Sequence, residues 1–365
     1  MKFGFTKLTS FLKTDISENK SEQSILGIDI GASAIKFVQI HSVKNIPTLE
    51  TYGELQLGPY EDLEIGRPTN LPEGKIIDAL GDILREANST GKQAVYALSY
   101  GSSFTSTILI PTIDPEQVHA MIPVEARKYV PTSLSRVTLD WLPLGIDKEE
   151  NVTNVLLSAV YNEAQKRYES IMSASNLSVL GNEIEIFSTI RATVSPEDEI
   201  VAVIDCGASA TRLYIVEKGV ITKTHSVPLS GVLFTHALSN ELGIPFDEAE
   251  EIKREFGILG TSDDPRIQKV LLKTLERGVR ELHTVLKRHS GSRDIKIQKT
   301  VLSGGGALLQ GITPYISDVF SLPVELADPF AKVAYPAFLE DTLKETGSSF
   351  AVAIGAALLG FQNVK

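Results

Sequence analysis

Two copies of one short motif, about half the chain apart, constrain most strongly what this sequence can fold into. The motif reads DIGASAIK at residues 29–36 and DCGASATR at residues 205–212. Each copy follows an aliphatic run and leads into another, a pattern typical of two strands joined by a tight turn. The sequence therefore predicts two related α/β halves, each opening with a β-hairpin.

Each predicted turn combines an acid, a glycine and a hydroxyl. Glycine permits close approach of an anion to backbone N–H groups, and carboxylate oxygens are the ligands that Mg²⁺ prefers. Two such turns facing each other would clamp a polyphosphate, with Asp29 and Asp205 near its Mg²⁺ or the waters around that ion. Lys36 follows the first turn and would reach a phosphate, although a solvated strand residue is the alternative. The same two interpretations stay open for Arg212.

The bulk composition excludes several classes of function. A length of 365 residues is enough for two domains, and a hydrophobic content of 42% supports real cores. The net charge of −11 provides no global basic field to attract nucleic acid or anionic lipid. The single cysteine, Cys206, excludes an internal disulfide framework and fits a reducing cytosol. The six histidines show no metal-binding spacing, and no apolar run approaches the roughly 18 residues that span a bilayer.

The first 23 residues are expected to form a flexible segment. They lack the long apolar core and the cleavage site of a signal peptide. Several phenylalanines and leucines do alternate with lysines here, so a weak amphipathic anchor for a membrane or a partner is a second interpretation. The simpler one is a frayed tail that precedes a polar linker.

Periodicity predicts the main elements of both halves. Asp114 is a good N-cap for a helix that begins at Pro115 and runs to Tyr129, and strands follow at 137–142 and 152–160. With a strand at 105–110, these elements suggest a small inserted subdomain over residues 104–160. Further helices are expected at 183–194, 246–256, 267–288, 308–317 and 349–361.

A third glycine-rich turn follows a short buried strand near the C-terminus. Ser303 is followed by Gly304, Gly305 and Gly306, which would let a flat ring or a phosphate lie against bare backbone. The segment is neither a P-loop, since no Gly-Lys-Ser/Thr follows, nor a dinucleotide-binding fingerprint. Its weight comes from its place after two Asp-x-Gly hairpins.

Two acidic elements each allow two interpretations. Glu250 and Lys253 share one face of a predicted helix, where they would hold ribose hydroxyls and a base, or simply form a solvated ion pair. Glu183 and Glu185 lie between the two halves. Either would orient a water for hydrolysis, or serve as an exposed acid at a helix start, where the helix dipole favours it.

Taken together, these features resemble the actin/Hsp70/sugar-kinase superfamily, and within it the PilM family of actin-like type IV pilus assembly proteins. The Asp-x-Gly hairpins are common to the superfamily, whereas the pair of stretches around residues 125–131 and 139–141 is the part that resembles PilM. The segments that carry the resemblance are GIDIGASAIK at 27–36, EARKYVP at 125–131, LDW at 139–141, EIEIFSTIRA at 183–192 and SGGG at 303–306.

The resemblance implies an α/β actin-like ATPase fold, with two related lobes around a nucleotide cleft and small subdomains 1C and 2B. It implies bound ATP and Mg²⁺, with Asp29 and Asp205 near the metal and Glu185 as the residue that orients water. The cofactor-binding residues that it implies are Asp29, Gly31, Ser33, Lys36, Asp205, Gly207, Ser209, Glu250, Lys253, Gly304, Gly305 and Gly306.

The implied subdomain boundaries follow the order of the elements. Subdomain 1A would take residues 24–103, 161–198 and 341–365. Subdomain 1C would take 104–160, subdomain 2A 199–230 and 299–340, and subdomain 2B 231–298.

The family also implies a partner and a location. A groove between 1A and 1C would bind the short cytoplasmic N-terminal tail of a PilN-like bitopic inner-membrane protein, alongside other pilus platform components. The chain would then be cytoplasmic, held at the inner face of the membrane through partners, without binding nucleic acid and with self-association left open.

Two positions depart from the family's pattern. Ser230 stands where the family tends to have glycine, near the nucleotide, and Ile186 stands where proline is common, beside the water-orienting acid.

Two other functions are alternatives. A small-molecule kinase of the same superfamily would need a catalytic acid facing a substrate pocket, which the sequence does not display. An FtsA-like division protein would use a C-terminal amphipathic helix, whereas this chain ends soon after a predicted core helix.

Overall fold

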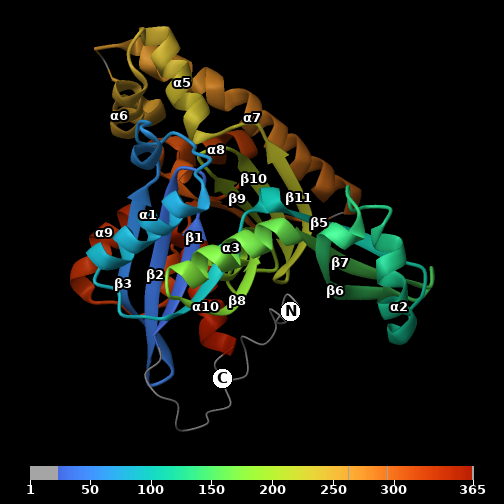
Figure 1. The fold of residues 1–365 in the computed structure, drawn as a ribbon. Helices are drawn as coiled ribbons and strands as arrows, with labels where there is room; N and C mark the ends of the chain where they lie inside the picture. The colour runs from blue at the N-terminus through green and yellow to red at the C-terminus, as the bar shows by residue number, and fades with distance from the viewer. Residues whose placement is uncertain (1–23, 262, 294, 364–365) are drawn as a thin grey trace.

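Two five-stranded sheets with the same strand arrangement form the body of the protein (Figure 1). The computed structural model describes residues 24–261, 263–293 and 295–363. The expected flexible segment at residues 1–23 lies outside this range. The first sheet has the order β3-β2-β1-β4-β8 and the second β11-β10-β9-β12-β13. In each sheet the central strand, β1 or β9, forms an antiparallel hairpin with the strand that follows it. On its other edge the central strand pairs in parallel with β4 or β12. The predicted duplication of the halves is thus confirmed.

The first lobe is built on the first sheet. Its strands are β1 (Ile25–Ile30), β2 (Ala34–Val43), β3 (Ile46–Gln56), β4 (Gln93–Leu98) and β8 (Ser178–Ile184). Its helices are α1 (Glu73–Glu86), α3 (Asn162–Ala174), α4 (Glu185–Thr193), α9 (Glu340–Thr346) and α10 (Ala351–Asn363).

The second lobe repeats the plan with different helices. Its strands are β9 (Ile200–Cys206), β10 (Thr211–Glu217), β11 (Val220–Val227), β12 (Lys299–Ser303) and β13 (Val324–Leu326). Its helices are α5 (Gly231–Leu242), α6 (Phe246–Phe256), α7 (Pro265–Arg293) and α8 (Ile312–Phe320).

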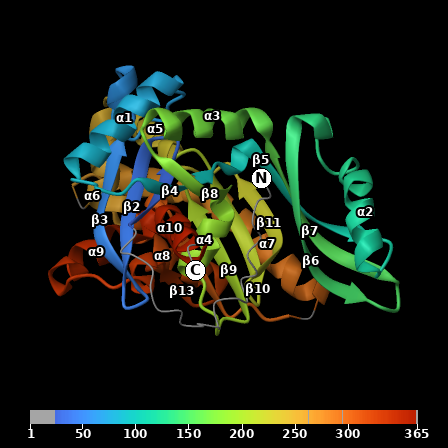
Figure 2. The ribbon, with the colours of Figure 1, turned by 60° about the horizontal axis from the view of Figure 1, so that its bottom comes forward.

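An inserted third sheet stands at one side of the first lobe, with its helix on the outer face (Figures 1 and 2). It consists of β5 (Ser103–Ile110), α2 (Pro115–Ala126), β6 (Val137–Asp147) and β7 (Val152–Tyr161), in the strand order β5-β7-β6. The Asp114 carboxylate caps α2 by accepting from the N–H of Glu116 at 2.9 Å, as expected for Asp before Pro. Because the sheet and α2 bury their own apolar cluster, the insertion has a separate small core.

Helices α4 and α10 lie between the two sheets and join the lobes. Small residues allow this close packing: a Cβ on Gly355 of α10 would lie 2.0 Å from the carbonyl oxygen of Ser188 on α4. No side chain larger than hydrogen fits there without moving one helix. None of the helices in the described residues has the length and apolar character needed to cross a lipid bilayer.

Three predicted helices start later than expected, including the last, which was expected from residue 349 and begins at Ala351. Residues 183 and 184 end strand β8, and α4 begins only at Glu185. The expected helix 308–317 begins at Ile312, after the four-residue 3-10 helix η6 (Gly305–Leu308). Residues 183 and 184 pair with β4, and η6 packs against Cys206 of β9. Local periodicity does not report such contacts with distant segments.

Candidate functional site

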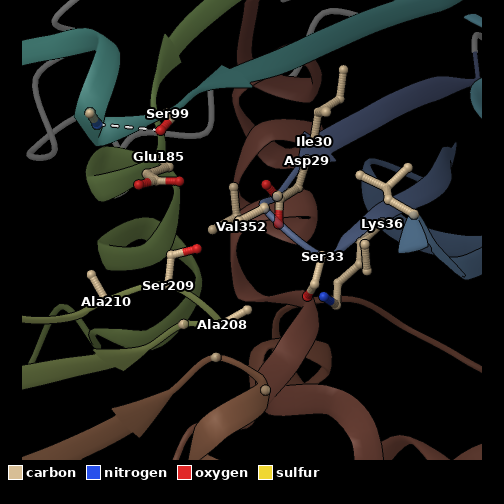
Figure 3. Close-up of a pocket in the computed structure, with 18 of the residues that line it drawn as sticks. Asp29, Ile30, Ser33, Lys36, Ser99, Glu185, Ala208, Ser209, Ala210 and Val352 are labelled. Carbon is tan, nitrogen blue, oxygen red and sulfur yellow. Dashed lines mark hydrogen bonds between the residues drawn. The ribbon is translucent and has the colours of Figure 1, made fainter. Parts of the chain in front are cut away.

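A single cleft of about 1540 Å³ between the lobes contains every residue proposed above for nucleotide binding. The first hairpin turn lines it from one lobe and the second turn from the other. In Figure 3, Asp29, Ser33 and Lys36 lie on one side of this cleft, with Glu185 and Ser209 on the other. The lining residues that the sequence predicted are Asp29, Gly31, Ser33, Lys36, Glu185, Asp205, Gly207, Ser209, Glu250, Lys253, Gly304, Gly305 and Gly306.

The two turns are built in the same way. The N–H of Gly31 donates to the carbonyl of Ala34 at 3.0 Å, and the N–H of Gly207 donates to that of Ala210 at 2.9 Å. Asp29 pairs across its hairpin with Lys36, as Asp205 does with Arg212. Each turn therefore presents one acid at the end of a buried strand and one cation directly opposite. Lys36 is not a freely solvated strand residue, because its side chain is only 14% exposed.

Burial raises the pKa of both hairpin aspartates to about 7. For Asp29, Lys36 opposes this shift, while Glu185 and Asp205 add to it. For Asp205, Glu185 adds to the shift, and Arg212 and Lys36 oppose it. A buried carboxyl group of this kind is costly to ionise, and a nearby cation stabilises its ionised form. This is the electrostatic condition expected of a site for a metal ion and phosphate.

The raised pKa values predict opposite pH trends for stability and for binding. Between about pH 4 and pH 7 the native state holds protons that the unfolded chain has released, so the free energy of unfolding without nucleotide should fall as pH rises. Affinity for Mg-ATP should rise from about pH 6 to about pH 8, because the metal requires ionised carboxylates. For wild type beside Asp29→Asn, urea unfolding across this pH range measures the stability and calorimetric titration with Mg-ATP measures the affinity. A wild-type pH dependence identical to that of the variant would contradict the assignment.

The triple-glycine turn lies directly against the second hairpin. Gly304 has φ +85°, and a Cβ on it would lie 2.6 Å from the carbonyl oxygen of Cys206 and 2.8 Å from Oδ1 of Asp205. Glycine is required here because the left-handed backbone and the close approach both exclude a side chain. Since η6 follows, the turn does not lead directly into an α-helix N-terminus as expected. Its backbone nevertheless forms one wall of the cleft.

Glu250 and Lys253 form a buried network and not the solvated ion pair that was one alternative. The Glu250 carboxylate accepts from Nζ of Lys253 and from Oγ1 of Thr235, both at 2.5 Å, and from Nε of Arg254 at 2.7 Å. Its side chain is 7% exposed. Burial raises the pKa of Glu250, but the charge and hydrogen bond of Lys253 and the other donors outweigh it, and the net pKa is lowered. An ionised, preorganised acceptor therefore lines the cleft from α6.

Glu185 forms a contact between the lobes. Its Oε1 accepts from Nη1 of Arg212 at 2.8 Å and from the N–H of Tyr100 at 2.9 Å. The Arg212 guanidinium also lies over the Tyr100 ring, 5.0 Å from its centroid. The side chains of Glu185 and Arg212 are 14% and 18% exposed, so neither the exposed helix-start acid nor the solvated strand cation describes them. Glu183, the other acid considered, lies apart from the cleft in a buried pair with Arg191.

Removing this contact should measurably destabilise the protein. Arg212→Met leaves Glu185 partly buried without its charged donor, so the free energy of unfolding should fall by roughly 1–3 kcal/mol. Urea unfolding measures the loss, and adding Glu185→Gln should recover part of it. As a matched control, Arg280→Met removes an ion pair whose arginine is 73% exposed and should cost less than about 1 kcal/mol. Equal losses in both variants would show that the contact between the lobes stabilises nothing.

The segment 57–71 is a part of the site that the sequence analysis missed. Its ends are tied to the first hairpin turn, because Leu57 and Thr69 donate to the carbonyls of Ser33 and Ala32, each at 2.8 Å. Its middle reaches the second lobe, where the Arg67 guanidinium lies 4.2 Å from the ring centroid of Phe246. The chain thus connects a phosphate turn of one lobe to α6 of the other. Asp62 and Gly66 take positive φ along this path, but residues of these two types are a weak signal in a sequence.

The stretches 129–131 and 139–141 lie in the inserted sheet. Val130, Leu139 and Trp141 belong to its apolar cluster, and the Trp141 ring packs edge-on against His119 with centroids 5.1 Å apart. These residues hold α2 against β6 and do not line the nucleotide cleft. Among the described residues no group of three or more His, Cys, Asp or Glu is arranged to hold a metal. A metal here would therefore take many of its ligands from phosphate and water, as Mg²⁺ commonly does.

Comparison with known proteins agrees with this geometry. A family model described as type IV pilus assembly protein PilM matches residues 27–361. A solved PilM-PilN type IV pilus biogenesis complex is similar with a TM-score of 0.76 and 26% identity, covering 94% of this chain and 99% of that one. MreB5 of Spiroplasma citri bound to AMPPNP is similar with a TM-score of 0.52 and 14% identity, covering 93% and 96%. These likenesses confirm the expected actin-like fold.

Curated relatives match over shorter stretches. The cell division protein FtsA of Neisseria meningitidis serogroup B is 28% identical over 158 residues, which is 38% of either chain. FtsA of Pseudomonas aeruginosa is 24% identical over 199 residues, 49% of this chain and 46% of that protein. The chain thus spans less than half the length of these relatives.

Proposed function

The chain belongs to the type IV pilus assembly protein PilM family, and from that premise we propose that it is an ATP-binding assembly protein of the pilus inner-membrane platform. The observation that carries the nucleotide proposal is the pair of equivalent Asp-x-Gly turns facing one cleft from two lobes. Backbone N–H groups of both turns suit phosphate oxygens. The Gly304–Gly306 wall and the Glu250 carboxylate suit the adenosine.

The residues present fit Mg-ATP. Asp29 and Asp205 would supply hard oxygen ligands for Mg²⁺ or its waters, and burial raises the pKa of both although Lys36 and Arg212 oppose the shift. Lys36 supplies a positive charge for phosphate, and Ser33 and Ser209 supply hydroxyls. Mg²⁺ held by these residues would neutralise phosphate charge.

We propose binding with slow hydrolysis at most. Glu185 is the acid that would orient water, but its Oε1 already accepts from Arg212 and from the Tyr100 N–H. A carboxylate held in this way is a weak general base, since its lone pairs are directed at protein donors. Binding and release of nucleotide would then bias the closure of the two lobes.

The partner proposal rests on the family and on the solved PilM-PilN complex. We propose that the chain binds the cytoplasmic N-terminal tail of a PilN-like membrane protein at the junction of 1A and 1C, and so reaches the membrane through that protein. The separate core of the inserted sheet supports a role as a recognition module.

The test is a calorimetric titration with the tail peptide of the co-encoded PilN-like protein, with and without Mg-ATP. Saturable binding of the peptide, and none of a scrambled peptide of the same composition, is the expected result. Failure of the tail to bind would remove the partner assignment and leave the nucleotide proposal standing. Titration with Mg-ATP alone tests the latter separately.

A further inference from the structure

The outer face of α7 is strongly basic on an otherwise acidic protein. This helix carries eight lysines and arginines against two glutamates, whereas the whole chain has a net charge of −11. Figure 1 shows α7 along one edge of the molecule, running from beside α5 and α6 towards the inserted sheet. At 29 residues it is about 43 Å long. We call the exposed cations of this helix the basic face: Arg266, Lys269, Lys273, Arg277, Arg280, Lys287 and Arg288.

The basic face is narrow and lies opposite the buried side of the helix. At 3.6 residues per turn its seven side chains project within an arc of about 100°. The apolar residues that anchor α7 on the second lobe project in the opposite direction. They include Ile267, Leu271, Leu275, Leu282 and Leu286, each at most 4% exposed. The cations therefore form one continuous row that faces away from the protein.

Little within the protein neutralises this row. No acidic residue of α7 falls within the arc. Among the described residues only Arg266 and Arg280 form ion pairs, with Asp264 and Glu276. The large exposed apolar side chains of the described chain include none on α7. An ordinary solvated helix mixes both signs of charge, so a one-sign row of this length indicates an anionic partner.

We propose that the basic face docks the protein on an anionic phospholipid bilayer. A straight row of flexible cations about 33 Å long, from Arg266 to Arg288, matches a flat, fluid surface. Specific protein interfaces instead place aromatic and apolar residues at their centre and are depleted in lysine. Nucleic-acid surfaces combine basic residues with stacking aromatics or hydrogen-bonding readers, which this face lacks. Because the chain as a whole carries a net charge of −11, attraction through this face also orients the molecule.

This surface is separate from the nucleotide cleft, since none of its residues lines the cleft. It adds a direct lipid contact to attachment through a membrane partner. Composition alone suggested no attraction to anionic lipid, because the net charge is a sum over the whole surface. A membrane contacts only one face of a protein, and the charge of that face can differ from the net charge. The contact is electrostatic and therefore sensitive to salt.

The experiment is co-sedimentation of the full chain with vesicles of phosphatidylcholine, with and without an equal share of phosphatidylglycerol. Wild type should bind only the anionic vesicles at about 0.1 M salt and should be released at about 1 M, where the Debye length is near 3 Å. The triple variant Lys269→Gln, Lys273→Gln, Arg277→Gln should bind on the order of a hundredfold more weakly, the loss expected for three basic residues at such a surface.

A charge-matched control separates the basic face from total charge. Lys75→Gln, Lys92→Gln and Lys148→Gln change the net charge equally at exposed positions outside α7, and this variant should bind as wild type does. Unchanged thermal unfolding of both variants shows that folding is intact. Equal binding of wild type and the α7 variant, or no preference for phosphatidylglycerol, would overturn the proposal. So would binding to a DNA duplex without any binding to vesicles, which would assign the face to nucleic acid.

Discussion

Replacing Arg191 with methionine is expected to lower the free energy of unfolding by about 3–5 kcal/mol, because Glu183 is left as an uncompensated buried charge. The two side chains are 6% and 7% exposed. Nη1 and Nη2 of Arg191 both donate to the Glu183 carboxylate, with Nη2 to Oε2 at 2.8 Å. Nη1 also donates to the carbonyl of Gly355 at 3.1 Å, and Oγ of Ser188 donates to Glu183 at 2.6 Å. The network ties β8, α4 and α10 together between the two sheets.

Urea unfolding of the variant measures this loss. The control is Arg85→Met, which removes an i,i+3 ion pair whose arginine is 72% exposed and should cost under about 1 kcal/mol. Adding Glu183→Gln to Arg191→Met removes the stranded charge and should recover a large part of the stability. If Arg191→Met cost no more than the control, the pair would not be the central tie that its burial indicates.

Neutralising either hairpin aspartate is expected to weaken Mg-ATP binding by on the order of 10–100-fold, the range typical for residues that orient metal-bound groups. Asp29→Asn and Asp205→Asn keep the shape of the side chain and remove the charge. Calorimetric titration measures the affinity. Asp78→Asn, at an exposed position of α1, makes the same charge change away from the cleft and should leave the affinity unaltered.

The same variants carry a second signature that a merely damaged fold would not show. Burial raises the pKa of both aspartates to about 7, so each is costly to ionise without nucleotide. The asparagine variants should therefore be more stable than wild type at about pH 8 without nucleotide, while gaining less from Mg-ATP. Unchanged nucleotide affinity in both variants would remove the aspartates from the site.

The sequence could predict what depends on neighbours along the chain. Helix α6 has the predicted bounds, Phe246–Phe256, because Pro245 precedes it and a glycine with positive φ follows it. The two hairpins were equally visible, since each combines alternating aliphatic residues with a glycine turn. From these local features the pairing of two related lobes followed, and with it the set of residues that share one cleft.

What the sequence missed depends on contacts between distant residues. Glu183 was placed at the start of a helix, but its backbone pairs with Ala97 of β4 and belongs to strand β8. The exposed interpretations of Glu185 and Lys253 were wrong for the same reason. Glu185 accepts from the N–H of Tyr100, far away along the chain, and Lys253 donates to Thr235 on another helix, α5.

The sequence by itself determined the two hairpins, the helix and strands of the insertion and the residue types that each turn brings to the cleft, because each of these is encoded by residues within a few positions of one another. Only the tertiary structure decided how the lobes are joined. The Arg212–Glu185 pair and the Arg67–Phe246 contact join partners from the two lobes, and the Glu183–Arg191 network joins β8, α4 and α10 within the first lobe. Helix and strand propensities depend on neighbouring residues and carry no information about such contacts. The energy of a buried contact depends on the exclusion of water, which only the complete fold achieves.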